Sequence, residues 1–339
     1  MSREKQRKRL LHVAELAGVS LSTVDRVLNE RGSVSDAKRR KVLQTAKALG
    51  INRTLPSAIH GLLRVDLLMV DSQADHFRRL GEAFARQAEM LKSRLVLQRL
   101  LWQERSPSQL LDHINGPRTP RQGLIVVGHD SPEVRQALDA QIQQGVPVVV
   151  VTTSMSGLPG ATYVGVDNEA AGRSAGSLMA RWMGRAGGRV LLITNSLLYE
   201  AHRQRVKGFN EALRERVPTA QISEPIECFD EDELSAEAVQ AALSDEGEWV
   251  GIYSTGSGTG GIYRVLKDRP NGLVWIGHEA TEAHAEMLRT GVLSLVLDQD
   301  ADGQAEAAIQ HLLYANGDLD VPPRVGPQMR IVIDETVQR

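Results

Sequence analysis

Two stretches near the amino terminus decide how the first part of the chain folds: VAELAGVSLSTVDRVLN at residues 13–29 and VSDAKRRKVLQTAKALG at residues 34–50. In the first stretch, apolar residues at helical spacing are interrupted by Gly18, which favours a turn between two short helices. Ser20 stands where its side chain can cap the second helix, which we expect to end near Asn29. The second stretch carries a third amphipathic helix. The pattern predicts a helix-turn-helix, which lays one helix in the major groove of DNA.

Charge is unevenly distributed along the chain. Residues 1–60 hold 13 Lys or Arg against 5 Asp or Glu, a formal charge of +8, while the whole chain carries −2. The remaining residues therefore carry −10. This asymmetry is expected when one part of a protein neutralises DNA phosphates and the other part does not. Residues 3–9 form a basic arm, and such arms are more commonly solvated tails than readers of sequence.

Composition excludes several classes of protein. With 339 residues and 42% hydrophobic content, the chain is long enough for a small head and a body of about two domains. No apolar run is long enough to span a membrane, and the first ten residues lead into the head without the apolar segment of a secretory signal. The lone Cys228 rules out a framework of intrachain disulfides. We therefore expect a cytoplasmic protein with no membrane association.

From residue 64 onward, short apolar runs alternate with amphipathic stretches, the order of elements in a doubly wound α/β fold with parallel sheets. The expected strands cover residues 65–70, 95–101, 123–127, 146–151, 162–167, 189–194, 249–254, 273–277 and 292–298. The expected helices cover residues 77–91, 106–115, 132–144, 169–184 and 202–216. Two such sheets in succession imply two lobes, with a ligand cleft between the carboxyl ends of their strands.

Residues 11–51 strongly resemble the DNA-binding head of the LacI-type repressors, through the two stretches quoted above. In that family the second helix lies in the major groove of double-stranded operator DNA. The resemblance implies contacts of Leu21, Ser22 and Arg26 with base edges, and of Ser20, Thr23 and Asn29 with phosphates. Arg26 suits a guanine, because a guanidinium donates two hydrogen bonds to O6 and N7.

Two regions depart from this family. Asp25 stands where the family has a small hydroxyl residue, and phosphates repel a carboxylate unless it accepts from a cytosine or pairs with an arginine. Asp25 is therefore either a determinant of sequence specificity or part of a salt-bridged helix surface. In the joint at residues 51–63, the family's Ala-Arg-x-Leu pattern is missing. Leu55, with Ile59 or Leu62 as alternatives, is the candidate for an apolar wedge into the minor groove.

The body resembles, over nearly its whole length, the periplasmic-binding-protein type I fold that LacI-type repressors carry behind their heads. The resemblance lies in YVGVDNEAAGRSAG at residues 163–176, HRQRVKGFNEAL at residues 202–213 and DQD at residues 298–300. In this family each lobe is discontinuous in sequence. The implied division is a head at 1–51, a hinge at 52–63 and a body at 64–339, with one lobe at about 64–165 plus 299–323 and the other at about 166–298 plus 324–339.

The resemblance also implies a ligand site formed by Asp71, Phe77, Asp130, Arg205, Thr255, Glu279 and Gln299. Carboxylates, amides and an arginine fork suit paired hydroxyls, and an aromatic face suits the C–H side of a ring. The expected effector is a sugar, a cyclitol or a sugar phosphate. The chain departs from the family where Thr255 and Gly256 replace an Asn-Asp pair and Glu279 replaces an Asp. His202 and His278 either line the cleft or are structural.

A competing hypothesis rests on the same region. Gly256, Gly258 and Gly261 form a G-x-G-x-x-G sequence after a strand, and Glu279 lies about 20 residues further on, as in dinucleotide-binding folds. That fingerprint normally opens a domain, whereas here it comes late in the second lobe. A dinucleotide-dependent oxidoreductase or redox-sensing regulator stays the alternative, and a solute-binding transport component is a third hypothesis. In the main hypothesis, the glycine loop lies close to the effector.

The sequence carries no P-loop, zinc-protease, paired CxxC or serine-elbow motif. We therefore expect no catalytic residue, no cofactor and no metal site. We expect a homodimer, because one helix-turn-helix makes few base contacts and two heads on a pseudo-palindromic operator supply the missing specificity. The sequence thus predicts a DNA-binding transcriptional repressor whose operator affinity depends on a small polar effector held between two lobes.

Overall fold

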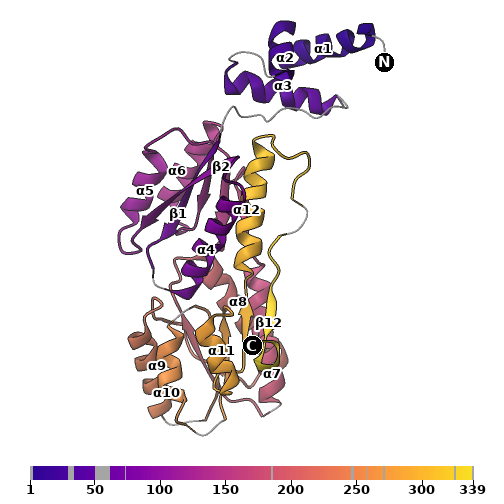
Figure 1. Ribbon diagram of the computed structural model, residues 1–339. Coiled ribbons are helices and arrows are strands. Elements are labelled where there is room, and N and C mark those ends of the chain that lie inside the picture. The colour runs from indigo at the N-terminus through magenta and orange to yellow at the C-terminus, as the bar shows by residue number, and fades with distance from the viewer. Residues whose placement is uncertain are drawn as a thin grey trace.

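The computed structural model describes residues 3–29, 34–49, 62–72, 74–184, 186–245, 248–256, 258–269, 272–323 and 326–337. Figure 1 shows the amino-terminal helices at one end of the molecule, followed by two α/β lobes. Leu55 and most of the predicted hinge lie outside the described residues. None of the helices in the described ranges has the length and apolarity that a membrane crossing requires.

The head consists of α1 (Arg3–Ala17), α2 (Leu21–Leu28) and α3 (Asp36–Ala48). Val13, Val24 and Val42, one from each helix, form a fully buried apolar core. The predicted cap is confirmed, because Ser20 Oγ accepts a hydrogen bond from the backbone N–H of Thr23 at 3.2 Å. The basic stretch at residues 3–9 belongs to α1.

The first lobe is built on a five-stranded parallel sheet in the order β2-β1-β3-β4-β5. Its strands are β1 (Leu63–Val70), β2 (Leu95–Trp102), β3 (Gly123–Val126), β4 (Val148–Val151) and β5 (Thr162–Val164). Its helices are α4 (Asp75–Met90), α5 (Pro107–Asn115), α6 (Pro132–Gln143) and α12 (Ala301–Ala315). Along β1, Leu67 packs under α4 and α12 while the next residue, Leu68, packs under α5 and α6. Burial on both faces explains why these strands are continuous apolar runs.

The second lobe is built on a sheet in the order β12-β11-β10-β9-β6-β7, with β8 also paired to β6. Its strands are β6 (Arg189–Thr194), β7 (Gln221–Ile222), β8 (Ile226–Glu227), β9 (Trp249–Ser254), β10 (Val274–His278), β11 (Leu295–Asp298) and β12 (Arg330–Val332). Its helices are α7 (Asn168–Met183), α8 (Glu200–Arg216), α9 (Asp232–Ser244), α10 (Thr259–Leu266) and α11 (Glu282–Arg289), and a 3₁₀ turn covers Asp334–Thr336. The strands pair in parallel except for β12, which runs antiparallel to β11. The predicted α/β class with two parallel sheets is confirmed.

The chain passes between the lobes more than once. After β11 of the second sheet, α12 packs against α4 and β4 of the first lobe, and β12 then returns to the second sheet beside β11. Figure 1 shows α12 alongside the first lobe and β12 beside the second. The chain therefore crosses the junction of the lobes more than once. The carboxyl ends of β-strands from both sheets lie at this junction.

The contact between α7 and α8 is unusually close because glycines line it. A Cβ on Gly176 would lie 2.6 Å from the carbonyl oxygen of Phe209. A Cβ on Gly208 would collide with the carbonyl oxygen of Glu169, and one on Gly172 with that of Arg205. This close approach fixes the backbone of α8 at Arg205 against α7.

Replacing Gly208 with Ala should therefore destabilise the fold. Alanine favours a helix over glycine by about 1 kcal/mol, but the methyl group collides with backbone that cannot move aside. We expect the free energy of unfolding to fall by about 2 kcal/mol, within the range for overpacked cores, measured by urea unfolding. The control is Gly272→Ala, whose Cβ would meet no atom within 4 Å. Equal unfolding midpoints for the two variants would show that the helix contact tolerates a side chain.

Candidate functional site

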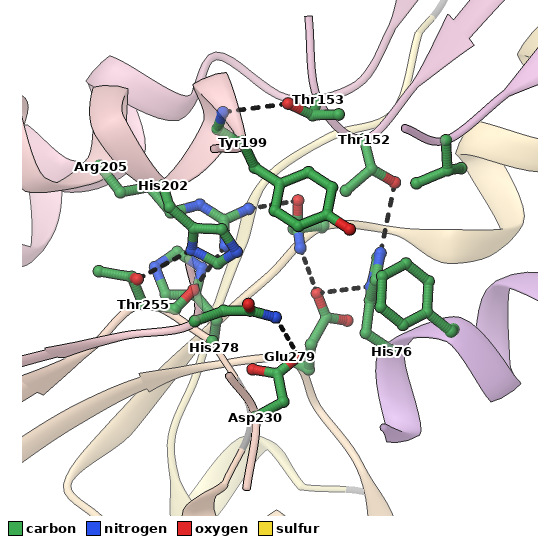
Figure 2. Close-up of a pocket in the computed structure, with 16 residues that line it drawn as sticks. His76, Thr152, Thr153, Tyr199, His202, Arg205, Asp230, Thr255, His278 and Glu279 are labelled. Atoms are coloured by element: carbon green, nitrogen blue, oxygen red, sulfur yellow. Dashed lines mark hydrogen bonds and ion pairs between the residues drawn. The ribbon is translucent and has the colours of Figure 1, made fainter. Parts of the chain in front are cut away.

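A pocket lies between the lobes, at the carboxyl ends of strands from both sheets, where ligands bind in doubly wound folds. His76, Phe77 and Thr152 line it from the first lobe, and Arg205 and Thr255 line it from the second. Figure 2 shows Arg205, His202 and Thr255 on one side of the pocket, opposite His76 and Thr152. The cavity is about 40 Å³, far below the roughly 300–1,000 Å³ of pockets that hold small molecules. The side chains of the walls occupy most of the site.

The guanidinium of Arg205 is buried in the wall of this pocket. The residue is 2% exposed. Its Nε donates to Asn168 Oδ1 at 2.8 Å, and its two terminal nitrogens donate to the carbonyl oxygen of Thr255 and to Gln299 Oε1. Burial lowers the pKa of Arg205 from its usual value. One buried cation thus joins α7, the loop after β9 and the segment that leaves β11.

Glu279 forms the facing wall. Its carboxylate is 3.1 Å from His76 Nδ1, accepts from Arg79 at 2.9 Å and accepts from Gln299 Nε2. Burial alone would raise the pKa of Glu279, but His76, Arg79 and Gln299 outweigh burial and hold the pKa at about 2. The carboxylate is therefore ionised at neutral pH. Because Arg79 and His76 belong to the first lobe, Glu279 also links the two lobes.

Two histidines of the second lobe line the same pocket, His278 buried and His202 half-buried. His202 Nδ1 lies 2.9 Å from Thr255 Oγ1, and His278 Nε2 lies 2.9 Å from the hydroxyl of Tyr253. Burial, followed by the charge of Arg205, lowers the pKa of both histidines well below 6.5. Both rings are therefore neutral at neutral pH, and each presents one donor and one acceptor.

Backbone strain is concentrated at this pocket. Thr152, Asp230 and Glu279 line it with φ angles of 68°, 60° and 73°. Side chains other than glycine rarely adopt these angles, least of all a β-branched threonine. Phe229 and Asp300, beside Asp230 and Gln299, are strained in the same way at 52° and 57°. Such strain persists only where the surrounding structure enforces it, and it gathers at functional sites.

Some polar atoms of the wall are buried without a hydrogen-bond partner in the described part of the chain. Asn195 Oδ1 and His278 Nδ1 are two of them, and both residues line the pocket. An unsatisfied buried polar atom costs roughly 1–3 kcal/mol. The wall therefore combines satisfied charges with neutral atoms that a ligand with hydroxyl groups can satisfy.

The predicted ligand residues divide into two groups. Those that line the pocket are Phe77, Arg205, Thr255, Glu279 and Gln299. Asp71 and Asp130 are not among the lining residues: Asp71 is exposed after β1, and the Asp130 carboxylate is engaged by Arg135 at 2.5 Å and Arg203 at 3.2 Å. In this structure Asp71 faces solvent and Asp130 bridges the lobes, and contact of these two aspartates with the ligand stays a prediction.

Several wall residues were not predicted. They are His76, Thr152, Asn195 and Asp230. Thr152 and Asn195 each directly follow a buried strand, which is the signal that identified other members of the site. His76 precedes the predicted Phe77 on α4, and Asp230 lies in a loop with no distinguishing pattern. His202 and His278, left between two interpretations, both line the pocket.

The glycine-rich loop is explained by packing. A Cβ on Gly261 would collide with the carbonyl oxygen of Asp232, and one on Gly258 would collide with Ser235 Oγ, so these glycines let α10 approach α9. A Cβ on Gly256 would lie 2.7 Å from the carboxylate of Asp230. Packing against α9 and Asp230 therefore accounts for these glycines without a ligand. The structure does not support the dinucleotide hypothesis for these glycines.

On α2 of the head, Ser22 and Arg26 are exposed. Arg26 Nε donates to the carbonyl oxygen of Ser22 at 3.3 Å, and Asp25 accepts from Asn29 Nδ2 at 2.7 Å. Asp25 therefore interacts with the amide of Asn29, one turn further along the chain. This contact favours a role on the helix surface over a role in sequence specificity.

Replacing Glu279 with Gln should change how stability depends on pH. The folded-state pKa of about 2 lies below the value of about 4.3 for an unfolded glutamate. The ionised carboxylate thus stabilises the fold fully above about pH 4.3, and this contribution is lost as the pH falls toward 2. In urea titrations, the stability difference between the wild type and Glu279→Gln should narrow below about pH 5, by up to roughly 1.4 kcal/mol per unit. The control is Glu237→Gln at an exposed position; a pH-independent difference for Glu279→Gln would contradict this assignment.

Comparisons with known proteins agree with this geometry. A family model for the periplasmic binding protein domain matches residues 67–318, and a model for bacterial regulatory proteins of the lacI family matches residues 9–52. Catabolite control protein A of Priestia megaterium is 26% identical over 299 residues, covering 84% of this chain and 86% of that protein.

Solved structures show the same body fold. The glucose-galactose binding protein GanP of Geobacillus stearothermophilus has a TM-score of 0.72 at 20% identity, covering 81% of this chain and 99% of that one. An ABC transporter solute binding protein of Bacillus halodurans with bound myo-inositol has a TM-score of 0.72 at 17% identity, covering 82% and 96%. The chain belongs to the periplasmic binding protein domain family and, with its lacI-family head, is a LacI-type DNA-binding transcriptional regulator.

Proposed function

We propose that this regulator is a homodimeric repressor in the cytoplasm, whose affinity for a pseudo-palindromic operator is set by a small polyhydroxylated effector bound between the lobes. The observation that carries this proposal is the pocket centred on Arg205, whose walls come from both lobes. A ligand in contact with both walls changes the free energy of one lobe arrangement relative to another, which is the requirement for allosteric control.

The chemistry of the walls supports a sugar or cyclitol. Arg205, Gln299 and Glu279 form a chain of donors and acceptors, and the neutral histidines add one of each. Polyols present hydroxyls that both donate and accept, so they can enter such a chain without leaving a charge unpaired. The structural relatives named for glucose and galactose, and the one with bound myo-inositol, have the same fold and favour the same ligand class.

Ion pairs outside the pocket also link the two lobes. Arg203 is 3.2 Å from Asp130, and Arg105 is 2.6 Å from Glu231, each pair joining the first lobe to the second. Arg105 is 86% exposed in its side chain, and exposed pairs contribute only about 0–1 kcal/mol. Because the pocket of about 40 Å³ cannot hold a sugar, the lobes separate to admit one, and this separation also breaks the buried pairs of Glu279 with Arg79 and His76.

The head supports recognition by two copies. α2 presents a short exposed surface around Ser22 and Arg26, too small for a specific site by itself. Two heads on successive major-groove faces, about 34–36 Å apart, double the number of base contacts. A change in lobe arrangement that alters the spacing of the two heads then changes operator affinity.

Arg205→Ala should abolish the response to the effector. In a thermal-shift screen of glucose, galactose, arabinose and myo-inositol, a compound that binds the folded wild type raises its melting temperature by mass action. Arg205→Ala should not respond to that compound, because its guanidinium organises both walls. The matched control, Arg214→Ala at an exposed position of the same helix, should respond like the wild type. A full response in Arg205→Ala would overturn the proposed site.

Arg26→Ala should weaken operator binding and relax base preference. Loss of a bidentate contact to guanine costs about 1–3 kcal/mol, or roughly 5- to 150-fold in the dissociation constant per half-site. Binding to an operator selected from random DNA, and to variants with one base pair changed in each half-site, measures both effects. Lys92→Ala, in the first lobe, is the control. Unchanged affinity together with unchanged base preference would remove Arg26 from the groove.

A further inference from the structure

Asn195 and Asp230 form a pair in the wall of the pocket. Asn195 follows β6, and Asp230 lies in the loop before α9. Asn195 Nδ2 donates to Asp230 Oδ2 at 2.6 Å. A carboxylate accepts hydrogen bonds and does not donate them, so it fixes which end of the amide faces it. The oxygen of Asn195 is therefore the end left for other partners, and this atom is buried with no partner in the described residues.

The backbone around the pair is built to hold it. Asp230 and its neighbour Phe229 adopt φ angles of 60° and 52°, which strain both residues. Gly256 lies against the pair, since a Cβ there would be 2.7 Å from Asp230 Oδ1 and 3.1 Å from Asn195 Cβ. Two strained residues and a glycine are needed to place one carboxylate beside one amide. Such an arrangement indicates a functional constraint.

The cations near the pocket already bind protein acceptors. Arg205 is the only Lys or Arg among the described lining residues, and it donates to Asn168, Thr255 and Gln299. Arg79 donates to Glu279 and Asp298. Burial keeps the pKa of His202 and His278 well below 6.5, so these rings add no positive charge at neutral pH.

An anionic group on a ligand would therefore face hydrogen-bond acceptors and negative charge at this pair. A phosphate ester carries about −1.5 to −2 charges near neutral pH and accepts hydrogen bonds at its oxygens. At the Asn195–Asp230 pair the wall offers it an amide oxygen and a carboxylate, and the carboxylate of Glu279 lines the same pocket. A hydroxyl group donates as well as accepts and carries no charge, so it can satisfy the oxygen of Asn195.

We propose that Asn195 and Asp230 are specificity-determining residues, which select an uncharged polyol whose hydroxyl donates to Asn195 Oδ1 and which exclude phosphate esters. This inference rests on the proposed function for the ligand class, but not for the exclusion of anions. It narrows the effector from a sugar, cyclitol or sugar phosphate to the first two.

Calorimetry on the full chain tests the proposal with matched pairs. The probes are glucose and glucose 6-phosphate, myo-inositol and its monophosphate, and inorganic phosphate against chloride at equal ionic strength. We expect any polyol that binds to do so at least about 100-fold more tightly than its phosphate ester, the scale of one close like-charge pair in a partly buried site. Inorganic phosphate should give no saturable binding. Saturable phosphate binding that is lost in Arg205→Ala, or a phosphate ester that binds as tightly as its parent, would overturn the proposal.

Variants of the pair sharpen the result. Asp230→Asn removes a charge and frees the Asn195 amide to turn, so the affinity for the phosphate ester relative to its parent should rise about tenfold. Asp112→Asn, an exposed carboxylate on α5, should leave this ratio unchanged, and equal ratios in the two variants would overturn the role of Asp230. If Asp230→Asn does not fold, Asn195→Ser removes the fixed acceptor instead and should weaken polyol binding. If no polyol binds, the proposed effector class is contradicted. The exclusion of anions is still decided, by the measurement with inorganic phosphate.

Discussion

The buried charge of Arg205 is the constraint on which the lobe junction depends. A guanidinium removed from water is tolerated only where protein acceptors replace the lost hydration, and its removal from a buried network leaves those acceptors unpaired. Here the acceptors come from α7, from the loop after β9 and from Gln299, which begins the return to the first lobe. Gln299 in turn donates to Glu279, and Glu279 binds Arg79 and His76 of the first lobe. The position of one lobe relative to the other is thus linked to the hydrogen bonds of a single side chain.

Close packing behind the pocket supports this network. The glycines of α7 and α8 allow the two backbones to touch, which brings Asn168 within hydrogen-bonding distance of Arg205. The glycines of α10 do the same against α9, where Asp230 and Asp232 lie. In both places a glycine serves helix packing and, through it, the placement of a polar wall residue. Pocket specificity and fold stability are therefore coupled, as they are wherever strained backbone lines a site.

The sequence predicts the parts of this molecule that depend on local patterns. Buried strands such as VVVV at residues 148–151 are uninterrupted apolar runs, and Ser20 lies before α2 at a capping position. β7 and β8 have two residues each and β12 has three, too few for any periodicity, and their pairing depends on distant strands. Within the site, Arg205, Glu279 and Gln299 follow from the family resemblance. Asn195 follows a buried strand and could have been found from that position, whereas Asp230 could not, because its place depends on a loop conformation that no local pattern encodes.

Contacts between distant parts of the chain also determine the surroundings of Asp130 and of the glycine-rich loop. Asp130 follows a strand, as ligand-binding carboxylates do. Its carboxylate, however, pairs with Arg135 of α6 and with Arg203 of α8 in the other lobe. The glycines at 256, 258 and 261 match a dinucleotide fingerprint in spacing, yet their close contacts with α9 and the loop before it account for them. In each case the residue type and spacing are typical of a ligand site. The contacts seen in the structure, with Arg203 for Asp130 and with α9 for the glycines, cannot be read from the local sequence.

We propose above all that the arrangement of the lobes and the binding of operator DNA are coupled. Because coupling between sites is reciprocal, operator DNA must itself change the lobe arrangement, whatever the effector is. Spin labels on Ser108→Cys of the first lobe and Glu237→Cys of the second, both exposed, in a Cys228→Ser chain report the distance between the lobes. Addition of a saturating operator, selected from random DNA, should shift the measured distance distribution. An unchanged distribution with the operator fully bound would contradict the claim.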